Sequence, residues 1–233
     1  MRSLIHACLA LASCANIVRA NTEKVIFLGP ETVNVPSTPP TLDDLHLDIL
    51  APDEWSMRLD LQASFPTHDL PLGTATWFLL TNLTKGQRYE LRQPTAFTLD
   101  VFELPAVWDT PELISSLAAY AFSRQPDLDS VDAPKGSRRA NNEYEASLLF
   151  LRVLAAADYF TDNATLMSHV EPVSVDLILD PYLLNALPRS LLPTIGYFVV
   201  VALCAWFLSR RILVWIQPVL AAEGKFAGKK KRL

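Results

Sequence analysis

Cysteine and glycine are both scarce in this chain of 233 residues, which contains three cysteines and seven glycines. Cys8 and Cys14 lie within the first 20 residues, and Cys204 lies in a long apolar stretch near the other end. Residues 21–189 therefore have no cysteine that could form a disulfide or act as a nucleophile. We expect this segment to depend for its stability on its own hydrophobic core or on a partner.

The sequence patterns of common enzyme classes are missing as well. The chain contains no G-x-S-x-G, H-E-x-x-H, P-loop or dinucleotide-binding glycine pattern. Asp127 and Asp129 have the spacing by which many sugar-nucleotide transferases hold a divalent ion. Such pairs follow a buried strand, whereas these two lie in a polar linker beside Pro126, which favours a solvated charge run. The histidines are scattered without the spacing of metal ligands: His6, His46, His68 and His169. We therefore predict a non-catalytic protein without a metal or cofactor.

The longest apolar stretch covers residues 190–209 and carries no formal charge. At about 1.5 Å per residue, such a helix is long enough to cross the roughly 30 Å hydrocarbon core of a bilayer. Arg189 precedes the stretch and Arg210 follows it, so we predict a transmembrane helix rather than a buried hairpin. Residues 212–222 are apolar but too short to span and contain Pro218. They either lie in the membrane interface or extend the helix.

The first 20 residues have the order of a secretory signal peptide. Arg2 precedes an apolar run over residues 4–15, and Val18 and Ala20 supply small residues at a cleavage site. We expect the mature chain to begin near Asn21. Because Arg19 is unusual beside a cleavage site, an uncleaved anchor is the alternative.

Charge predicts the orientation of the chain in the membrane. Residues 21–189 contain 11 basic and 24 acidic residues, whereas residues 210–233 contain seven basic residues and one acidic residue. Because basic residues that follow a span stay in the cytosol, we expect a single-pass type I protein with residues 21–189 in the lumen. The basic tail can contact anionic membrane lipid, so its charge needs no nucleic acid partner.

Two lysines near the end of the sequence predict a location. Lys231 and Lys230 are the third and fourth residues from the printed end, which resembles the dilysine signal that the coat-protein machinery reads for retrieval. A plain stop-transfer cluster is the alternative. With retrieval, the protein would reside in the membrane of the endoplasmic reticulum.

Residues 21–189 are expected to form a mainly β domain, an immunoglobulin-like or fibronectin-like sandwich with a small helical insertion. About seven strand candidates have period-two alternation or β-prone composition: residues 21–28, 45–50, 55–65, 76–80, 89–92, 96–104, 147–159, whose periodicity also fits a helix, and 170–179. A capping threonine, Thr110, and Pro111 predict a short helix over 110–120. Residues 125–142 are polar and predict a mobile insertion.

Two local patterns refine this expectation. Tyr89 follows a turn at Gly86 and is either a tyrosine corner, whose hydroxyl bonds the preceding backbone, or an ordinary hairpin tyrosine. Asn82 and Asn163 each begin an N-x-T sequon, and both lie in the segment that the predicted topology places in the lumen. We therefore treat both asparagines as candidate glycosylation sites.

Several short strings resemble a known family, the fungal co-activator subunit of GPI-mannosyltransferase II. They cover residues 22–27, 80–83, 86–92, 93–97, 155–159, 175–181 and 187–190. Members of that family carry extra residues, including a tryptophan, where Arg92 here directly precedes Gln93. A shortened strand at this point would weaken the pairing of residues 89–92.

The resemblance implies a non-catalytic subunit in the endoplasmic reticulum. Such a subunit would support a multi-pass mannosyltransferase that adds the second mannose to the GPI precursor, and the catalytic residues would belong to that enzyme. Two other classes remain open: a type I cargo receptor or chaperone-like membrane protein of the endoplasmic reticulum and Golgi, and a luminal glycan-processing enzyme. A sustained coiled-coil heptad pattern would favour the receptor, and we find none in the sequence.

Overall fold

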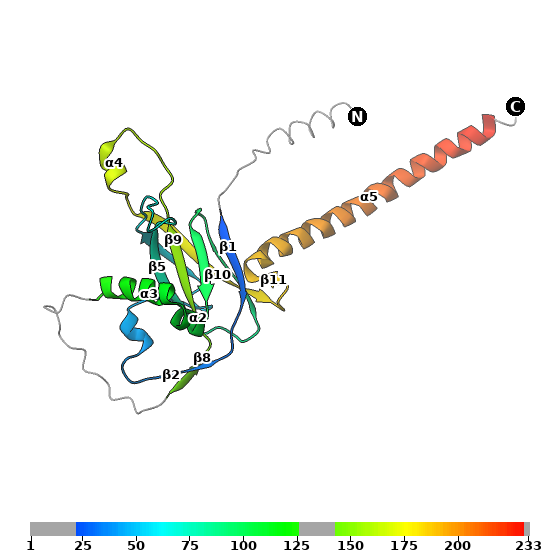
Figure 1. Cartoon of the computed structure of the whole chain (residues 1–233). Helices are drawn as coiled ribbons and strands as arrows, with labels where there is room; N and C mark the ends of the chain where they lie inside the picture. Colours follow the sequence, from blue (N-terminus) through cyan, green and yellow to red (C-terminus); the bar gives the residue numbers. More distant parts are fainter. Residues whose placement is uncertain (1–21, 126–142, 231–233) are drawn as a thin grey trace. The chain divides into compact units, whose positions relative to one another are not determined.

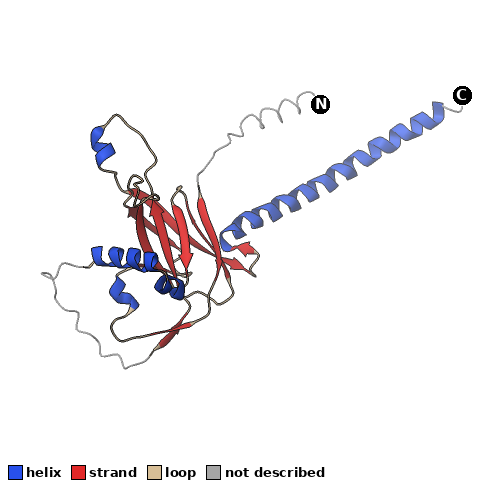
Figure 2. Ribbon diagram, in the orientation of Figure 1, coloured by secondary structure: helices blue, strands red, loops and turns tan. Residues whose placement is uncertain are grey.

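The computed structural model describes residues 22–125 and 143–230, and it divides the chain into two units, before and after the Ala186–Leu187 bond. The first unit is mainly β with a small helical part, and the second contains one long helix (Figures 1 and 2). The predicted signal peptide, residues 1–20, lies outside the described residues, as does most of the predicted insertion over 125–142.

One sheet of the first unit contains the strands that pair in the order β1, β6, β10, with β4 also paired to β10, all antiparallel. Their bounds are β1 Glu23–Leu28, β4 Ser56–Leu61, β6 Arg88–Gln93 and β10 Val173–Leu183. β6 pairs with β1 over its whole length, from Arg88 opposite Leu28 to Gln93 opposite Glu23. The direct junction of Arg92 and Gln93 therefore leaves this strand paired.

A second sheet has the strand order β3, β5, β9, β7. The bounds are β3 Asp48–Leu50, β5 Thr74–Leu80, β7 Thr98–Phe102 and β9 Leu149–Ala155. β3 pairs with β5 in parallel, and the other pairs are antiparallel. Residues 149–155, whose periodicity also fits a helix, form a strand as expected.

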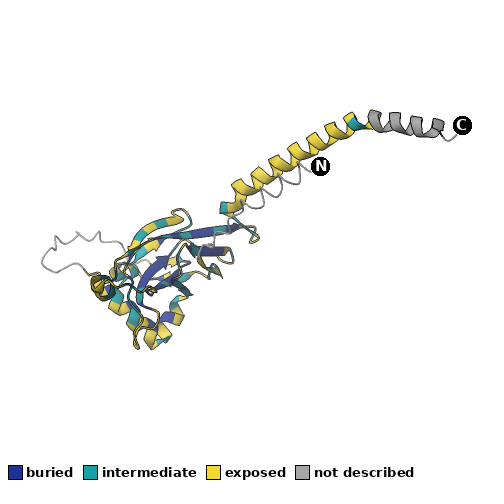
Figure 3. Cartoon of the chain, turned by 90° about the horizontal axis from the view of Figure 1, so that it is seen from above, coloured by how far each residue is buried: buried dark blue, intermediate teal, exposed yellow. Residues whose placement is uncertain are grey.

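The main hydrophobic core lies between the two sheets. Alternate residues of β5 and β9 reach it, including Phe78 and Leu151, and Leu91 and Leu177 enter it from the other sheet. The intervening residues of β5 and β9, such as Trp77, face a second core on the opposite side. Because the central strands β5 and β9 are buried on both faces, they are almost continuously apolar. Figure 3 shows the buried residues in the interior of the first unit.

Short helices cover the outer face of the second sheet, where they meet a two-stranded ribbon (Figures 1 and 2). These elements are η1 Leu42–Leu45, α2 Leu104–Asp109, α3 Pro111–Ser123, β2 Val33–Val35 and β8 Tyr144–Ala146. Proline stands in the first turn of both α2 and α3, where its missing N–H has no helical partner to lose. A further short helix, α4 Ala164–Ser168, lies in the loop between β9 and β10.

The structure corrects several sequence-based boundaries. The strand expected over 55–65 covers only Ser56–Leu61, and the strand expected over 147–159 covers only Leu149–Ala155. Residues 45–50 were expected to form one strand, but Leu45 ends η1 and only Asp48–Leu50 pair as β3. His46 between them has a φ of 50°, which interrupts an extended strand. The strand expected over 96–104 ends at Phe102, because Leu104 begins α2.

Tyr89 forms the hydrogen bond expected of a tyrosine corner. Its hydroxyl accepts from the backbone N–H of Thr84 at 2.9 Å and donates to the side chain of Gln87 at 3.0 Å. Gly29 fits against this corner because a Cβ there would collide with the carbonyl group of Thr84. The tyrosine hydroxyl therefore satisfies a backbone donor that a phenylalanine would leave without a partner.

The second unit begins with β11 Leu187–Pro188 and η3 Arg189–Leu191 and continues as α5 Leu192–Lys230. The helix passes through 212–222, so this apolar segment extends it, with Pro218 inside. Among the described residues, 189–218 form one stretch long and apolar enough to cross a membrane, with a mean hydropathy of 2.2 over its most apolar window. This confirms the expected candidate span and lengthens it beyond residue 209.

Candidate functional site

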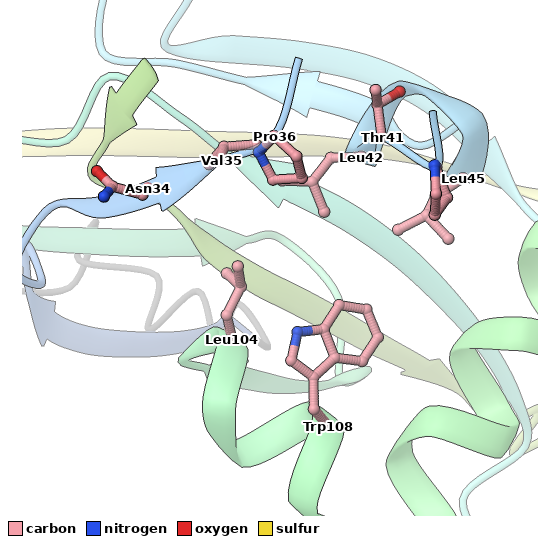
Figure 4. A pocket seen from close by; sticks show the side chains of 9 residues that line it. Asn34, Val35, Pro36, Thr41, Leu42, Leu45, Leu104 and Trp108 are labelled. Atoms are coloured by element: carbon pink, nitrogen blue, oxygen red, sulfur yellow. The ribbon is translucent and has the colours of Figure 1, made fainter. Parts of the chain in front are cut away.

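An apolar groove lies between α2 and the segment that connects β2 to η1. We call it the Trp108 groove, and it has a volume of about 340 Å³. Its lining residues are Asn34, Val35, Pro36, Pro40, Thr41, Leu42, Leu45, Leu104 and Trp108. In Figure 4, Leu104 and Trp108 extend from α2 toward Pro36 and Leu42 on the opposite wall.

Local sequence positions both walls of the groove. Leu104 and Trp108 are four residues apart, so they lie on the same face of α2. On the other wall, Asp44 accepts hydrogen bonds from the backbone N–H of Thr41 at 2.6 Å and from its hydroxyl at 3.2 Å. These bonds fix the start of η1, which holds Leu42 and Leu45 toward the second core.

The chemistry of the Trp108 groove is that of a binding surface. None of its lining residues is ionisable, and the polar side-chain groups are those of Asn34 and Thr41 and the indole N–H of Trp108. The indole of Trp108 packs edge-on against Phe150 at 5.8 Å between ring centroids, yet 43% of the residue stays exposed. A half-exposed tryptophan whose ring also packs against Phe150 is well suited to anchor an apolar group of a partner.

Charged and polar side chains gather on the outward face of the first sheet. We call Lys24, Glu90, Arg92, Asp180 and Tyr182 the charged cluster. Glu90 and Asp180 are directly opposite each other in β6 and β10 and are both buried. Arg92 approaches both carboxylates, at 3.5 Å from Glu90 and 3.9 Å from Asp180.

Two further groups complete the environment of Glu90. The Tyr182 hydroxyl donates to Glu90 Oε2 at 3.1 Å, and Lys24 Nζ lies 3.8 Å from the same oxygen. Burial raises the pKa of Tyr182, and the hydrogen bond to Glu90 raises it further. The phenol therefore stays protonated at neutral pH and can donate. Cations or hydrogen-bond donors therefore face the buried carboxylates of Glu90 and Asp180 and compensate their negative charge. These interactions also join strands β1, β6 and β10.

Both candidate glycosylation sites lie on exposed residues of the first unit. Asn82 is exposed with a φ of 56° and precedes the buried Leu83. Asn163 caps α4, and its side-chain oxygen accepts from the N–H of Thr165 at 3.0 Å. Glycosylation at either residue stays a prediction.

The structure brings none of the other sequence candidates into one site. Lys230 ends α5, whereas Lys231 lies outside the described residues, as do His6, Asp127 and Asp129. Within 22–125 and 143–230, no three His, Cys, Asp or Glu side chains are placed to hold a metal ion.

Sequence reasoning missed both the Trp108 groove and the charged cluster. Proline after Leu104 marks the first turn of α2 and could have indicated that helix. The alternation of Glu90 and Arg92 could have placed both on one face of β6. Their proximity to Asp180, 90 positions later, depends on strand register, which no local pattern supplies.

No family model, curated protein or solved structure matches this chain.

Proposed function

We propose that this protein is a membrane-anchored, non-catalytic subunit that binds and supports a multi-pass mannosyltransferase of the endoplasmic reticulum. The observation that carries the proposal is the pairing of a folded β unit with a single helix long and apolar enough to cross a bilayer. Leu187–Leu191 alone separate the first unit from α5. Such a tether raises the local concentration of the domain near a membrane enzyme to roughly millimolar.

Orientation and location are part of the same proposal. The excess of basic residues after residue 209 supports a cytosolic C-terminal side and a luminal first unit. Lys230 and Lys231 support retrieval by the coat-protein machinery. We also propose that the two-sheet domain is of the immunoglobulin or fibronectin type, which the Tyr89 corner supports.

The identity of the partner comes from sequence resemblance. The strings around residues 80–97 and 175–190 resemble the fungal co-activator subunit of GPI-mannosyltransferase II. The proposed reaction is therefore the addition of the second mannose to the GPI precursor, with the chemistry carried out by the partner enzyme. The Trp108 groove, whose lining is apolar, supports a role in binding.

We place the partner contact at the Trp108 groove, where an apolar side chain from a luminal loop of the enzyme would insert. Trp108→Ala is expected to reduce recovery of the enzyme in a detergent pull-down of the full chain by at least tenfold. The reason is that a central aromatic anchor contributes about 2 kcal/mol or more to an interface. The measurement is the amount of co-purified multi-pass enzyme per amount of this chain.

Phe122→Ala is the matched control. Phe122 is 76% exposed on α3 and is absent from the lining of the groove, so its loss removes a comparable aromatic surface. We expect recovery of the enzyme to be unchanged in this variant. Equal recovery with both variants would contradict the assignment of the groove, and failure to recover any multi-pass enzyme with the unsubstituted chain would contradict the proposed function.

A further inference from the structure

The turn that follows β10 displays a leucine that the fold does not use for packing. Leu184 is 99% exposed, and the neighbouring Leu183 is 39% exposed. The backbone N–H of Ala186 donates to the carbonyl of Leu183 at 3.1 Å, which closes a four-residue turn. Leu184 and Asn185 at its centre have φ angles of 52° and 56°. Positive φ at both central residues defines a type I′ turn.

Leucine is a poor residue for this position. Type I′ turns favour asparagine, aspartate or glycine at the centre, because a branched side chain at positive φ is strained. Asn185 fits the turn and is held there: its amide donates to the carbonyl of Gly86 at 2.8 Å, and its oxygen accepts from the N–H of Arg88 at 2.8 Å. The pinned turn therefore keeps Leu184 strained and in solvent, with no packing gain within the first unit.

The chain itself indicates what covers this leucine. Leu184 precedes the first residue of α5, Leu192, by eight positions. An extended chain covers at most about 3.5 Å per residue, so the turn is tethered within about 28 Å of the start of the apolar helix. Arg88 is exposed, and its backbone N–H bonds to Asn185 in the turn. Lys85 is also exposed beside the turn, but its ammonium is paired with Glu31 at 2.6 Å. An exposed leucine next to the exposed Arg88 is suited to a surface that contacts acyl chains and lipid headgroups.

We infer that the turn at residues 183–186 docks the first unit on the membrane surface, with Leu184 inserted into the bilayer interface. This rests on the membrane-anchored part of the proposed function and adds a second contact between the chain and lipid. It does not depend on the mannosyltransferase. Docking would restrict the orientations of the domain that the short connection to α5 leaves open.

The test is spin-label accessibility in the full chain, reconstituted in phosphatidylcholine bilayers after Cys8, Cys14 and Cys204 are changed to serine. Single labels are placed by Leu184→Cys, by Leu203→Cys in the candidate span, and by Leu70→Cys, a 52% exposed residue of another loop. We expect the label at 184 to collide several-fold more with oxygen, relative to a water-soluble nickel complex, than the label at 70. The label at 203 should give the highest ratio.

Two results would contradict this account. Equal ratios at 184 and 70, with a high ratio at 203, would overturn the docking inference and leave the anchor intact. A turn that is covered by protein rather than by lipid would also give this result. A low ratio at 203 would instead contradict the membrane anchor, and the docking inference with it.

One substitution distinguishes the effect of backbone strain at Leu184 from the effect of its insertion into the bilayer interface. Leu184→Asn suits positive φ and removes the apolar side chain, so the melting temperature should stay the same or rise. A label at Lys85→Cys in this background should become several-fold more accessible to the nickel complex than the same label beside Leu184. Unchanged accessibility at 85 would contradict insertion of Leu184 even if the protein is fully folded.

Discussion

Trp77→Ala is expected to lower the free energy of unfolding by about 3–5 kcal/mol, the range for loss of a large buried aromatic side chain. Trp77 is fully buried, and its indole N–H donates to the Ser116 hydroxyl of α3 at 3.2 Å. Its ring meets Phe150 edge-on at 6.2 Å, and the guanidinium of Arg152 lies 5.8 Å from the ring centroid. The substitution therefore opens a cavity and removes a hydrogen bond that ties α3 to the sheet. Urea unfolding of the full chain in detergent, followed by far-ultraviolet circular dichroism, measures the change.

Two variants show whether burial causes this loss. Trp77→Phe keeps an aromatic ring but removes the bond to Ser116, so a loss of about 1–2 kcal/mol is expected. Trp55→Ala removes a tryptophan that is 48% exposed, and we expect a change of about 0.5 kcal/mol. Equal losses for Trp77→Ala and Trp55→Ala would contradict the placement of Trp77 in the core.

Glu90→Ala is expected to cost about 3 kcal/mol, because it removes the central acceptor of the charged cluster. The Tyr182 hydroxyl would lose its acceptor, and Arg92 and Lys24 would lose a carboxylate at 3.5 and 3.8 Å. Tyr182 is buried and Arg92 is partly buried, so leaving them without this acceptor costs more than the net gain of forming the pairs, whereas Lys24 is mostly exposed and contributes little. The same urea unfolding measures the loss. In a double-mutant cycle, Tyr182→Phe should add less to Glu90→Ala than it costs alone.

An exposed ion pair on the same sheet is the matched control. Arg58 makes two hydrogen bonds to Asp176, at 2.7 and 2.9 Å, and its side chain is 76% exposed. Arg58→Ala should cost much less than Glu90→Ala because solvent screens the pair. Hydrogen bonds from Arg58 lower the pKa of Asp176, so the contribution of this pair is present at neutral pH and is lost as the pH falls through that lowered pKa. A loss for Arg58→Ala equal to that for Glu90→Ala would contradict the burial argument.

The sequence indicated most of the β structure because period-two alternation directly reports one buried face. Ser56–Leu61 and Val173–Leu183 follow that pattern, and Pro111 after Thr110 marked the start of α3. Tyr89 after a turn was sufficient to suggest a corner, and its hydroxyl does bond to Thr84. These features are local, so residues within a short window carry the necessary information.

The features that position the candidate sites are non-local, and the sequence did not predict them. β3 and β5 pair in parallel, which depends on the path of the chain between them. The groove forms only when α2 and the segment before η1 cover the same sheet, and Trp108 alone is an ordinary surface tryptophan. The sequence also did not predict the exposure and positive φ of Leu184, because a single leucine in a sequence indicates neither property.

The measurement that tests the proposed function most directly is the composition of GPI precursors after depletion of this protein. Loss of the supporting subunit should disable the partner enzyme, so precursors that carry one mannose should accumulate and those with two or more should decline. Re-expression of the unsubstituted chain or Phe122→Ala should restore the normal pattern, and Trp108→Ala should not. Normal precursor composition in depleted cells would contradict the proposed function and favour the cargo-receptor alternative.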